Sequence, residues 1–289
     1  MSQTFSQAVA PRKSVDVRPY SRRAIRKPRR QDLELKLNAL QRDYAELHTS
    51  IFEAAQVHRR LCAPRHLRFG NFDFASEIFA VRQLPGDFFS VEETGDGVVF
   101  ALGDICGKGL AAGMWTPHLV GLVRAHTTPS ATPQEIVAGV NRDISRTPAV
   151  TPFASLFLAK LDPDTGVLNY CSAGHPPALL LRGDGQMEML TDGGLLLGAL
   201  AEAEYSTGAC VFSADDTLLI YSDGITESLN PAGEEFGYAR LERHLRASHQ
   251  GSADSILFSV LGAVQDFAAT RPLVDDMSLA VIRHDGKAH

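Results

Sequence analysis

The sequence of 289 residues has little cysteine and no long hydrophobic run, and each scarcity excludes a class of protein. The four cysteines are far apart and show no CxxC spacing, which argues against a zinc knuckle and for a reduced, cytoplasmic compartment. No stretch approaches the roughly 18 consecutive apolar residues of a membrane span, so no span is predicted. The N-terminus also lacks the apolar segment of a secretory signal.

Charge is distributed unevenly along the chain, although the net charge is only -6. Residues 1–30 contain nine Lys or Arg and one Asp, which leaves 19 basic and 33 acidic residues in the rest of the chain. We predict that residues 1–30 form a disordered basic tail. The remainder is acidic, which suits cation binding, and it has no basic stripe interleaved with aromatic residues, which argues against a nucleic-acid-binding protein.

Residues 31–64 are predicted to form one amphipathic linker helix that ends near Pro64. Its apolar residues recur mainly at steps of three and four: Leu33, Leu35, Leu37, Leu40, Tyr44, Leu47, Ile51, Ala54, Val57 and Leu61. The alternating steps from Leu33 to Ile51 are also typical of a short coiled coil. Two interpretations stay open at this stage, a homodimer seam through residues 31–64 and packing of the helix on its own domain.

Short apolar runs alternate with turn sequences from residue 65 to the C-terminus. Helices are predicted from about Ala111 to His126, from Thr132 onward and over Ser252–Phe267, and Thr132 with Glu135 forms a capping box. Strands are predicted over residues 72–81, 88–91, 98–102, 153–161, 167–171, 178–181, 187–190, 217–221 and 277–282. Long meanders with two or three helices favour an α+β domain over residues 65–289, in which helices cover the sheet faces.

Acidic residues occupy the junctions between predicted strands and loops. Asp104 and Asp223 each follow an apolar strand, whereas Asp87 and the pair Asp275-Asp276 directly precede one. Hard cations such as Mg²⁺ and Mn²⁺ take oxygen ligands, and two such ions about 3.5–4 Å apart can activate a water and brace a phosphoryl group. The sequence therefore predicts a two-metal site at a sheet rim. The alternative is that each aspartate is an ordinary turn residue.

Five short motifs strengthen the metal interpretation because they resemble those of one known family. They are Pro85-Gly86-Asp87-Phe88-Phe89, Gly103-Asp104-Ile105-Cys106-Gly107-Lys108-Gly109, Ala173-Gly174-His175-Pro176-Pro177, Tyr221-Ser222-Asp223-Gly224-Ile225-Thr226-Glu227 and Asp275-Asp276-Met277-Ser278-Leu279. In this order they resemble the SpoIIE/RsbU-type branch of the metal-dependent protein phosphatase (PPM) superfamily. The resemblance covers roughly residues 65–285.

The resemblance implies an αββα sandwich of two antiparallel sheets flanked by helices, with two divalent metal ions, Mn²⁺ or Mg²⁺, at one rim. Asp104 would bridge both ions, with Asp104 and Asp223 central to catalysis. Asp87 and the backbone carbonyl of Ile105 would complete one metal site, and Asp223 and Asp275 would complete the other, with Asp276 as the alternative to Asp275. Arg82 lies five residues before Asp87, where some superfamily members contact the substrate phosphate, and an ordinary surface charge is an equal alternative there.

Three positions depart from the family pattern, and one motif residue invites a second role. Ser90 stands where a second acidic residue is common. Pro85 stands where the family usually has glycine, which predicts a different local loop. Cys106 stands where animal and plant relatives have a general-acid histidine, so protonation of the leaving group is left unassigned. His175 is interpreted as a structural hydrogen-bonding residue rather than a ligand.

The resemblance also implies a function. The chain would be a protein serine/threonine phosphatase acting on a phosphoserine or phosphothreonine protein, a STAS-type anti-sigma-factor antagonist in bacterial partner switching. An activator protein could act through residues 31–64. The alternative is a phosphatase-like module that has lost its chemistry and docks a signalling partner, and the presence of all the aspartates argues against it.

Overall fold

The computed structural model describes residues 30–62, 65–146 and 153–286, and the predicted basic tail lies outside these ranges. The chain divides into two compact units between residues 47 and 48. The division falls inside helix α1 (Arg30–Cys62), so the predicted linker helix forms and belongs to both units. No helix in the described ranges is both long enough and apolar enough to cross a membrane.

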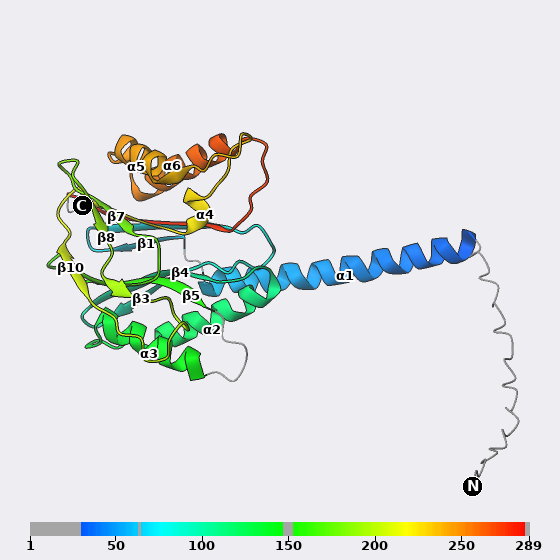
Figure 1. Cartoon of the computed structure of the whole chain (residues 1–289), viewed down its shortest axis with the longest axis horizontal. Helices are drawn as coiled ribbons and strands as arrows, with labels where there is room; N and C mark the ends of the chain where they lie inside the picture. Colours follow the sequence, from blue (N-terminus) through cyan, green and yellow to red (C-terminus); the bar gives the residue numbers. More distant parts are fainter. Residues whose placement is uncertain (1–29, 63–64, 147–152, 287–289) are drawn as a thin grey trace, which may run out of the picture. The chain divides into compact units, whose positions relative to one another are not determined.

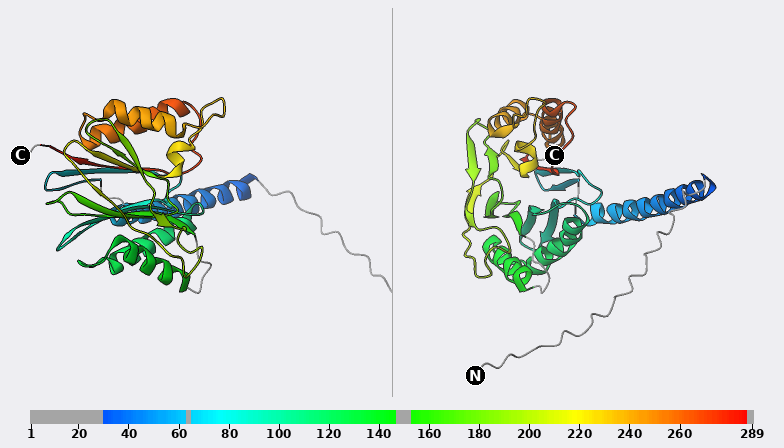
Figure 2. Two further views of the ribbon diagram at one scale, coloured as in Figure 1. Left: turned by 60° about the vertical axis from the view of Figure 1, so that its left-hand side comes forward. Right: turned by 45° about the vertical axis from the view of Figure 1, so that its right-hand side comes forward.

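The second unit is a sandwich of two six-stranded sheets stacked face to face between pairs of helices (Figures 1 and 2). The first sheet has the order β1 (His66–Phe69), β2 (Phe72–Phe79), β12 (Met277–His284), β11 (Thr217–Tyr221), β7 (Ala178–Leu181) and β8 (Met187–Leu190). The second has the order β10 (Gly208–Val211), β6 (Val167–Ala173), β5 (Ala154–Leu161), β4 (Gly97–Ile105) and β3 (Phe88–Thr94), with β9 (Gly193–Gly194) beside β6. All pairings are antiparallel except that of β6 with β9.

Five helices complete this unit. The second sheet packs against α2 (Leu110–His126) and α3 (Pro133–Arg146), and the first packs against α5 (Gly237–Ser248) and α6 (Ala253–Ala268). The short α4 (Asp223–Thr226) follows β11 directly (Figure 1). The predicted αββα architecture is thereby confirmed.

Side-chain alternation explains why both sheets are buried on both faces. In β4, Val99 and Ala101 join the core under α2 and α3, whereas Phe100 points into the core between the sheets. In β11, Ile220 faces the other sheet and Leu219 faces α5 and α6. Successive side chains of a strand point to opposite faces, so a strand buried on both sides carries a continuous apolar run, as Val98–Leu102 of β4 and Leu218–Tyr221 of β11 do.

The predicted helix boundaries hold to within one or two residues where a capping signal marks them. The backbone N–H of Thr132 donates to Glu135 Oε2 (2.9 Å), and that of Glu135 donates to Thr132 Oγ1 (3.3 Å), which is the predicted capping box before α3. The expectation of two or three helices after residue 65 was wrong, because the described ranges contain five. The missed α5 buries only Leu241 and Leu245.

Candidate active site

The predicted acidic residues come together because antiparallel neighbours begin and end at the same edge of a sheet. Asp87 directly precedes β3, and Asp104 is the penultimate residue of the adjacent strand β4. Asp223 lies two residues after β11, and Asp275 lies two residues before the adjacent β12. Each sheet therefore contributes one pair of carboxylates to one rim of the sandwich.

Asp87 is the most deeply buried of these carboxyl groups, with a relative exposure of 1 %. The Ser278 hydroxyl, from the other sheet, donates a hydrogen bond to Asp87 Oδ2 and so connects the two pairs. Burial raises the pKa of Asp87 well above its usual range, and the neighbouring Asp104 raises it further. The charged form of Asp87 is therefore unfavourable by itself, and binding of a proton or a cation would stabilise this residue.

Gly86 allows the Asp87 loop to contact the end of β4. A Cβ atom at this position would lie 3.1 Å from the carbonyl oxygen of Ile105 and 3.4 Å from Asp104 Oδ1. These are the oxygens that the sequence assigned to one metal site together with Asp87. The structure thus brings all three predicted oxygen donors to one place.

The pKa of Asp104 is affected by burial and also by its pair partner Asp87 and by the Asp223–Asp275 pair of the other sheet. Burial raises its pKa to about 6; a hydrogen bond with Asp87 opposes this shift, and the negative charge of Asp223 adds to it. Burial likewise raises the pKa of Asp223, with the charge of Asp275 as the next cause. The mutual effects show that the four predicted carboxylates form one acidic cluster.

Gly224 holds the Asp223 segment against the Asp275 segment. An added Cβ at Gly224 would lie 2.0 Å from the carbonyl oxygen of Asp276, so only glycine fits there. The backbone N–H of Ser222 donates to the Ser278 carbonyl (3.0 Å), and the N–H of Ser278 donates to Ser222 Oγ (2.9 Å). The two segments are therefore held together by backbone contacts that do not depend on a ligand.

A family model described as Stage II sporulation protein E (SpoIIE) matches residues 94–285. The chain belongs to this family. The match spans the second sheet from β4 onward and all of the acidic cluster except Asp87. The predicted relationship to SpoIIE/RsbU-type metal-dependent phosphatases is thereby confirmed.

Individual relatives support the same SpoIIE-type assignment. The phosphoserine phosphatase RsbU of Bacillus subtilis is 25 % identical over 242 residues, which cover 82 % of this chain and 71 % of RsbU. The SiaA-PP2C domain of Pseudomonas aeruginosa superposes with a TM-score of 0.73 at 16 % identity, covering 84 % of this chain and 99 % of that domain. The catalytic domain of the phosphatase PstP, solved with two manganese ions, superposes with a TM-score of 0.53 at 18 % identity over 73 % of this chain and 97 % of that one. These structural similarities establish a shared fold.

The two adjacent aspartates of the last SpoIIE motif have different partners in the structure. Asp276 accepts hydrogen bonds from the backbone N–H of Val81 (2.7 Å) and of Gly86 (2.9 Å), one on each oxygen. Asp275 instead forms an ion pair with Lys108, at 2.6 Å between Nζ and Oδ2. Asp276 therefore orders the loop that carries Asp87, whereas Asp275 points toward Asp223 and Lys108.

Two basic residues lie beside the acidic cluster. The Lys108 ammonium also donates to the Val274 carbonyl (3.0 Å). The Arg82 guanidinium lies over Gly109, since an added Cβ there would be 3.0 Å from its Nη1. The sequence predicted Arg82 as a phosphate contact but assigned nothing to Lys108, whose position depends on a loop that sequence patterns do not specify.

A cavity of about 390 Å³ opens beside Asp104 and Asp223, and His175 forms part of its wall. Burial lowers the pKa of His175 to about 3, so the imidazole is neutral at physiological pH. Its Nδ1 is 2.8 Å from the hydroxyl of Ser155, the residue that pairs with Asp104 in the ladder between β4 and β5. His175 thus has the hydrogen-bonding role that the sequence suggested, and it adjoins the acidic cluster.

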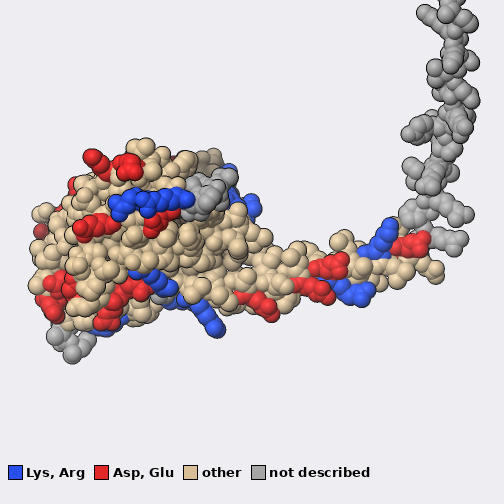
Figure 3. Space-filling view, turned by 90° about the horizontal axis from the view of Figure 1, so that it is seen from below, with Lys and Arg blue, Asp and Glu red and all other residues tan. Residues whose placement is uncertain are grey.

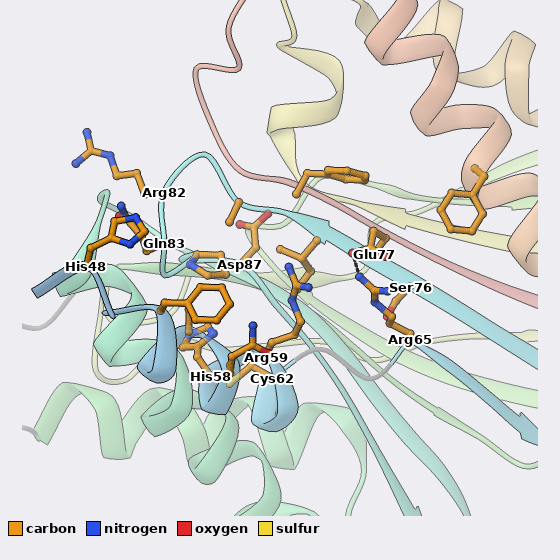
Figure 4. A pocket seen from close by; sticks show the side chains of 18 residues that line it. His48, His58, Arg59, Cys62, Arg65, Ser76, Glu77, Arg82, Gln83 and Asp87 are labelled. Carbon is orange, nitrogen blue, oxygen red and sulfur yellow. Dashed lines mark hydrogen bonds and ion pairs between the residues drawn. The ribbon is translucent and has the colours of Figure 1, made fainter. Parts of the chain in front are cut away.

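A second cavity, of about 650 Å³, reaches Asp87 from the side of α1 (Figure 4). His58 and Cys62, on the last turns of α1, line it and are almost completely buried. Arg82 and Gln83 line the same cavity, with the Arg82 side chain directed away from Asp87 in Figure 4, and the Arg65–Glu77 ion pair (3.0 Å) lines it farther along β2. The part of α1 after residue 47 is therefore packed next to the loop that carries Asp87.

The donor set fits hard divalent cations. Carboxylate and carbonyl oxygens are the ligands that Mg²⁺ and Mn²⁺ prefer, and the Lys108 ammonium is paired with only Asp275 among the four described aspartates. In the ranges that the structure describes, no three Asp, Glu, His or Cys side chains are already grouped tightly enough to hold an ion. The carboxylates instead have protein partners, Ser278 for Asp87 and Lys108 for Asp275. Metal binding would exchange at least some of these partners.

Proposed function

We propose that the chain is a metal-dependent protein serine/threonine phosphatase. The observation that carries the proposal is the convergence of Asp87, Asp104, Asp223 and Asp275 at one rim, two from each sheet. Membership of the SpoIIE family and similarity to a protein named phosphoserine phosphatase support the reaction. A cluster of four carboxylates repels a phosphate unless cations neutralise it, so activity would depend on metal.

The geometry supports the predicted division of ligands between two sites. Asp104 would bridge, Asp87 and the Ile105 carbonyl would complete one site, and Asp223 and Asp275 would complete the other. Asp276 is better assigned as a positioning residue, because both of its oxygens already accept backbone hydrogen bonds. We therefore propose Asp275 as the ligand, and Asp276 stays the alternative that the sequence left open.

When bound, the two ions would activate a water and neutralise the phosphoryl oxygens during in-line displacement. The chain itself fixes the carboxylates on strand ends, and Arg82 is kept as the proposed phosphate contact, since a guanidinium can bind phosphate through two parallel hydrogen bonds. Cys106 is not suited to act as the nucleophile. Burial raises the pKa of its thiol, and the charge of Asp104 raises it further, whereas nucleophilic catalysis requires a thiolate.

The substrate proposed is a phosphorylated STAS-type protein in partner-switching signalling. The supporting observation is the similarity to RsbU over 82 % of this chain.

The first prediction is that phosphate release from a phosphoserine STAS-type protein requires millimolar Mn²⁺ or Mg²⁺ and is abolished by a chelator. Release should be measured with both metals and with the corresponding phosphothreonine protein. Release that continues undiminished in excess chelator would contradict the two-metal mechanism.

The non-catalytic module remains the second candidate, and the same assay separates it from the enzyme. A module would bind the phosphoprotein without releasing phosphate at any metal concentration. A nucleic-acid function receives no support from the face shown in Figure 3, where the basic and acidic side chains of the described residues are interspersed and no basic patch extends across it.

We further propose that the N-terminal half of α1 forms a homodimer seam and that an activator acts through this helix. Four leucines of this half lie at coiled-coil spacing and are each more than half exposed: Leu33, Leu37, Leu40 and Leu47.

The prediction is that the full chain self-associates and that the Leu37→Glu, Leu40→Glu double variant is monomeric. Leu35→Glu is the matched control, because Leu35 is 69 % exposed but lies off this stripe. Sedimentation velocity over a concentration series measures the outcome, and a wild type that stays monomeric throughout would refute the seam.

A further inference from the structure

Lys108 occupies an unusual place in the loop between β4 and α2. It lies between Gly107 (φ 126°) and Gly109 (φ 80°), both in a region of backbone conformation that favours glycine. A Cβ added at Gly107 would meet nothing within 4 Å, so this side of the loop is open. Glycine on both sides gives the lysine backbone freedom that an ordinary loop residue lacks.

The Lys108 ammonium crosses the acidic cluster from one sheet to the other. It forms its ion pair with Asp275 (2.6 Å) and its hydrogen bond to the Val274 carbonyl (3.0 Å), both in the segment before β12. Asp223 attracts it as well, whereas Arg82 repels it. The ammonium is thus the positive charge that balances the Asp223–Asp275 pair in this structure, and it lies next to the guanidinium assigned to substrate phosphate.

We propose that Lys108 is an exchangeable counter-ion: it holds Asp275 until a divalent cation takes this carboxylate, and it then binds the substrate phosphate beside Arg82. The inference rests on the proposed function and adds a residue to the same site. A divalent cation bound at Asp275 would repel the ammonium that is paired with Oδ2 of this carboxylate, because like charges repel. Once displaced, the side chain remains tethered near the cluster, and a phosphate dianion is its best available partner.

This arrangement links metal binding to substrate binding. The first ion in the Asp223–Asp275 site would pay an electrostatic penalty for displacing the ammonium, and the displaced ammonium would then strengthen the attraction for phosphate. Loss of the lysine should therefore have opposite effects on the two ligands. A lysine that merely supported the loop would weaken both.

The test is titration of the metal-free full chain with Mn²⁺ by calorimetry, for wild type, Lys108→Gln and Lys108→Arg. Lys108→Gln is expected to bind Mn²⁺ at least about fivefold more tightly. The repulsion energy between two unit charges about 4 Å apart in water is roughly 1 kcal/mol, and a change of 1.4 kcal/mol in binding free energy changes affinity tenfold. Lys108→Arg, which keeps the charge, should stay close to wild type. Arg246→Gln is the matched control, because it removes one positive charge from an ion pair with Glu242 (2.8 Å) on α5.

The second measurement is steady-state hydrolysis of the phosphoserine protein at saturating Mn²⁺. Lys108→Gln should raise KM about tenfold with a smaller change in kcat, and Lys108→Arg should restore most of the loss. Tighter Mn²⁺ binding together with a raised KM supports the proposal. If the wild type is an active phosphatase but Lys108→Gln binds Mn²⁺ no more tightly than wild type, the counter-ion proposal is overturned and the proposed function stands. Failure of both proteins to bind Mn²⁺ overturns the proposed function and this inference together.

Discussion

The Asp104→Asn variant is expected to lose more than about 100-fold of its metal-dependent phosphatase activity, although it folds normally. Loss of a residue that only supports a metal ligand already costs 10–100-fold in affinity or activity, and Asp104 would itself contact both ions. The same substitution should stabilise the metal-free protein at neutral pH. Activity on the phosphoserine protein and urea unfolding in excess chelator measure the two effects separately.

The expected stabilisation of the metal-free Asp104→Asn variant follows from the raised pKa of Asp104. In the folded, metal-free protein this pKa is about 6, against 3.8 for an unperturbed aspartate. Between these values the folded state holds a proton that the unfolded state has released, so stability falls as pH rises through this window and stays low above it. The contribution is bounded at about 3 kcal/mol. Asparagine carries no charge at any of these pH values and removes this penalty.

The controls for this prediction are the two adjacent aspartates of the last motif. Asp275→Asn should weaken Mn²⁺ binding strongly, whereas Asp276→Asn should act mainly by loosening the loop that carries Asp87, since Asp276 is hydrogen-bonded to Val81 and Gly86. A metal-free Asp104→Asn protein less stable than wild type at pH 7.5 would contradict the electrostatic account. Equal Mn²⁺ affinities for wild type and Asp104→Asn would contradict the bridging role.

The Gly224→Ala variant is expected to lose both stability and metal affinity. The added methyl group would lie 2.0 Å from the Asp276 carbonyl oxygen, so the segments carrying Asp223 and Asp275 must move apart. Overpacking of this kind costs about 1–3 kcal/mol, and the displacement falls directly on two proposed ligands. Urea unfolding with and without Mn²⁺ should show a lower midpoint and a smaller stabilisation by metal than in wild type.

Gly121→Ala is the matched control for this prediction. Gly121 is exposed in the middle of α2, and an added Cβ would meet nothing within 4 Å. Alanine there should stabilise the protein by up to about 1 kcal/mol through helix propensity, without any effect on Mn²⁺. If Gly224→Ala were as stable as wild type and bound Mn²⁺ equally well, close approach of the two segments would not be a requirement of the site.

The strand-end aspartates could be predicted from sequence because each is marked locally by an apolar strand and an adjacent loop. Their convergence could not be derived from the same signals. Asp87 and Asp104 meet through pairing of β3 with β4, but the contact of Asp87 with Ser278 spans 191 residues and depends on how the two sheets stack. The family resemblance supplied this information, since the motifs occur in the family's order.

Other features depend on side-chain partners that no motif specifies. The separate roles of Asp275 and Asp276 follow from which backbone N–H groups lie nearby, and Lys108 acquires its role from a loop with positive-φ glycines. Helix α5 was missed because it is short and largely polar, with only two buried residues, Leu241 and Leu245, to mark its apolar face. The assignment of individual ligands remains a prediction that the variants above can test.

Because each sheet contributes one pair of carboxylates to the rim, the distance between the two sheets sets the distance between the two pairs. Within a sheet, ladder hydrogen bonds fix the separation of neighbouring strands, whereas the separation of stacked sheets is set by the volume of the side chains between them. Phe74 and Phe100 meet edge to face in that layer, with ring centroids 5.4 Å apart. Large side chains between the sheets thus determine how far apart the two halves of the proposed catalytic rim lie.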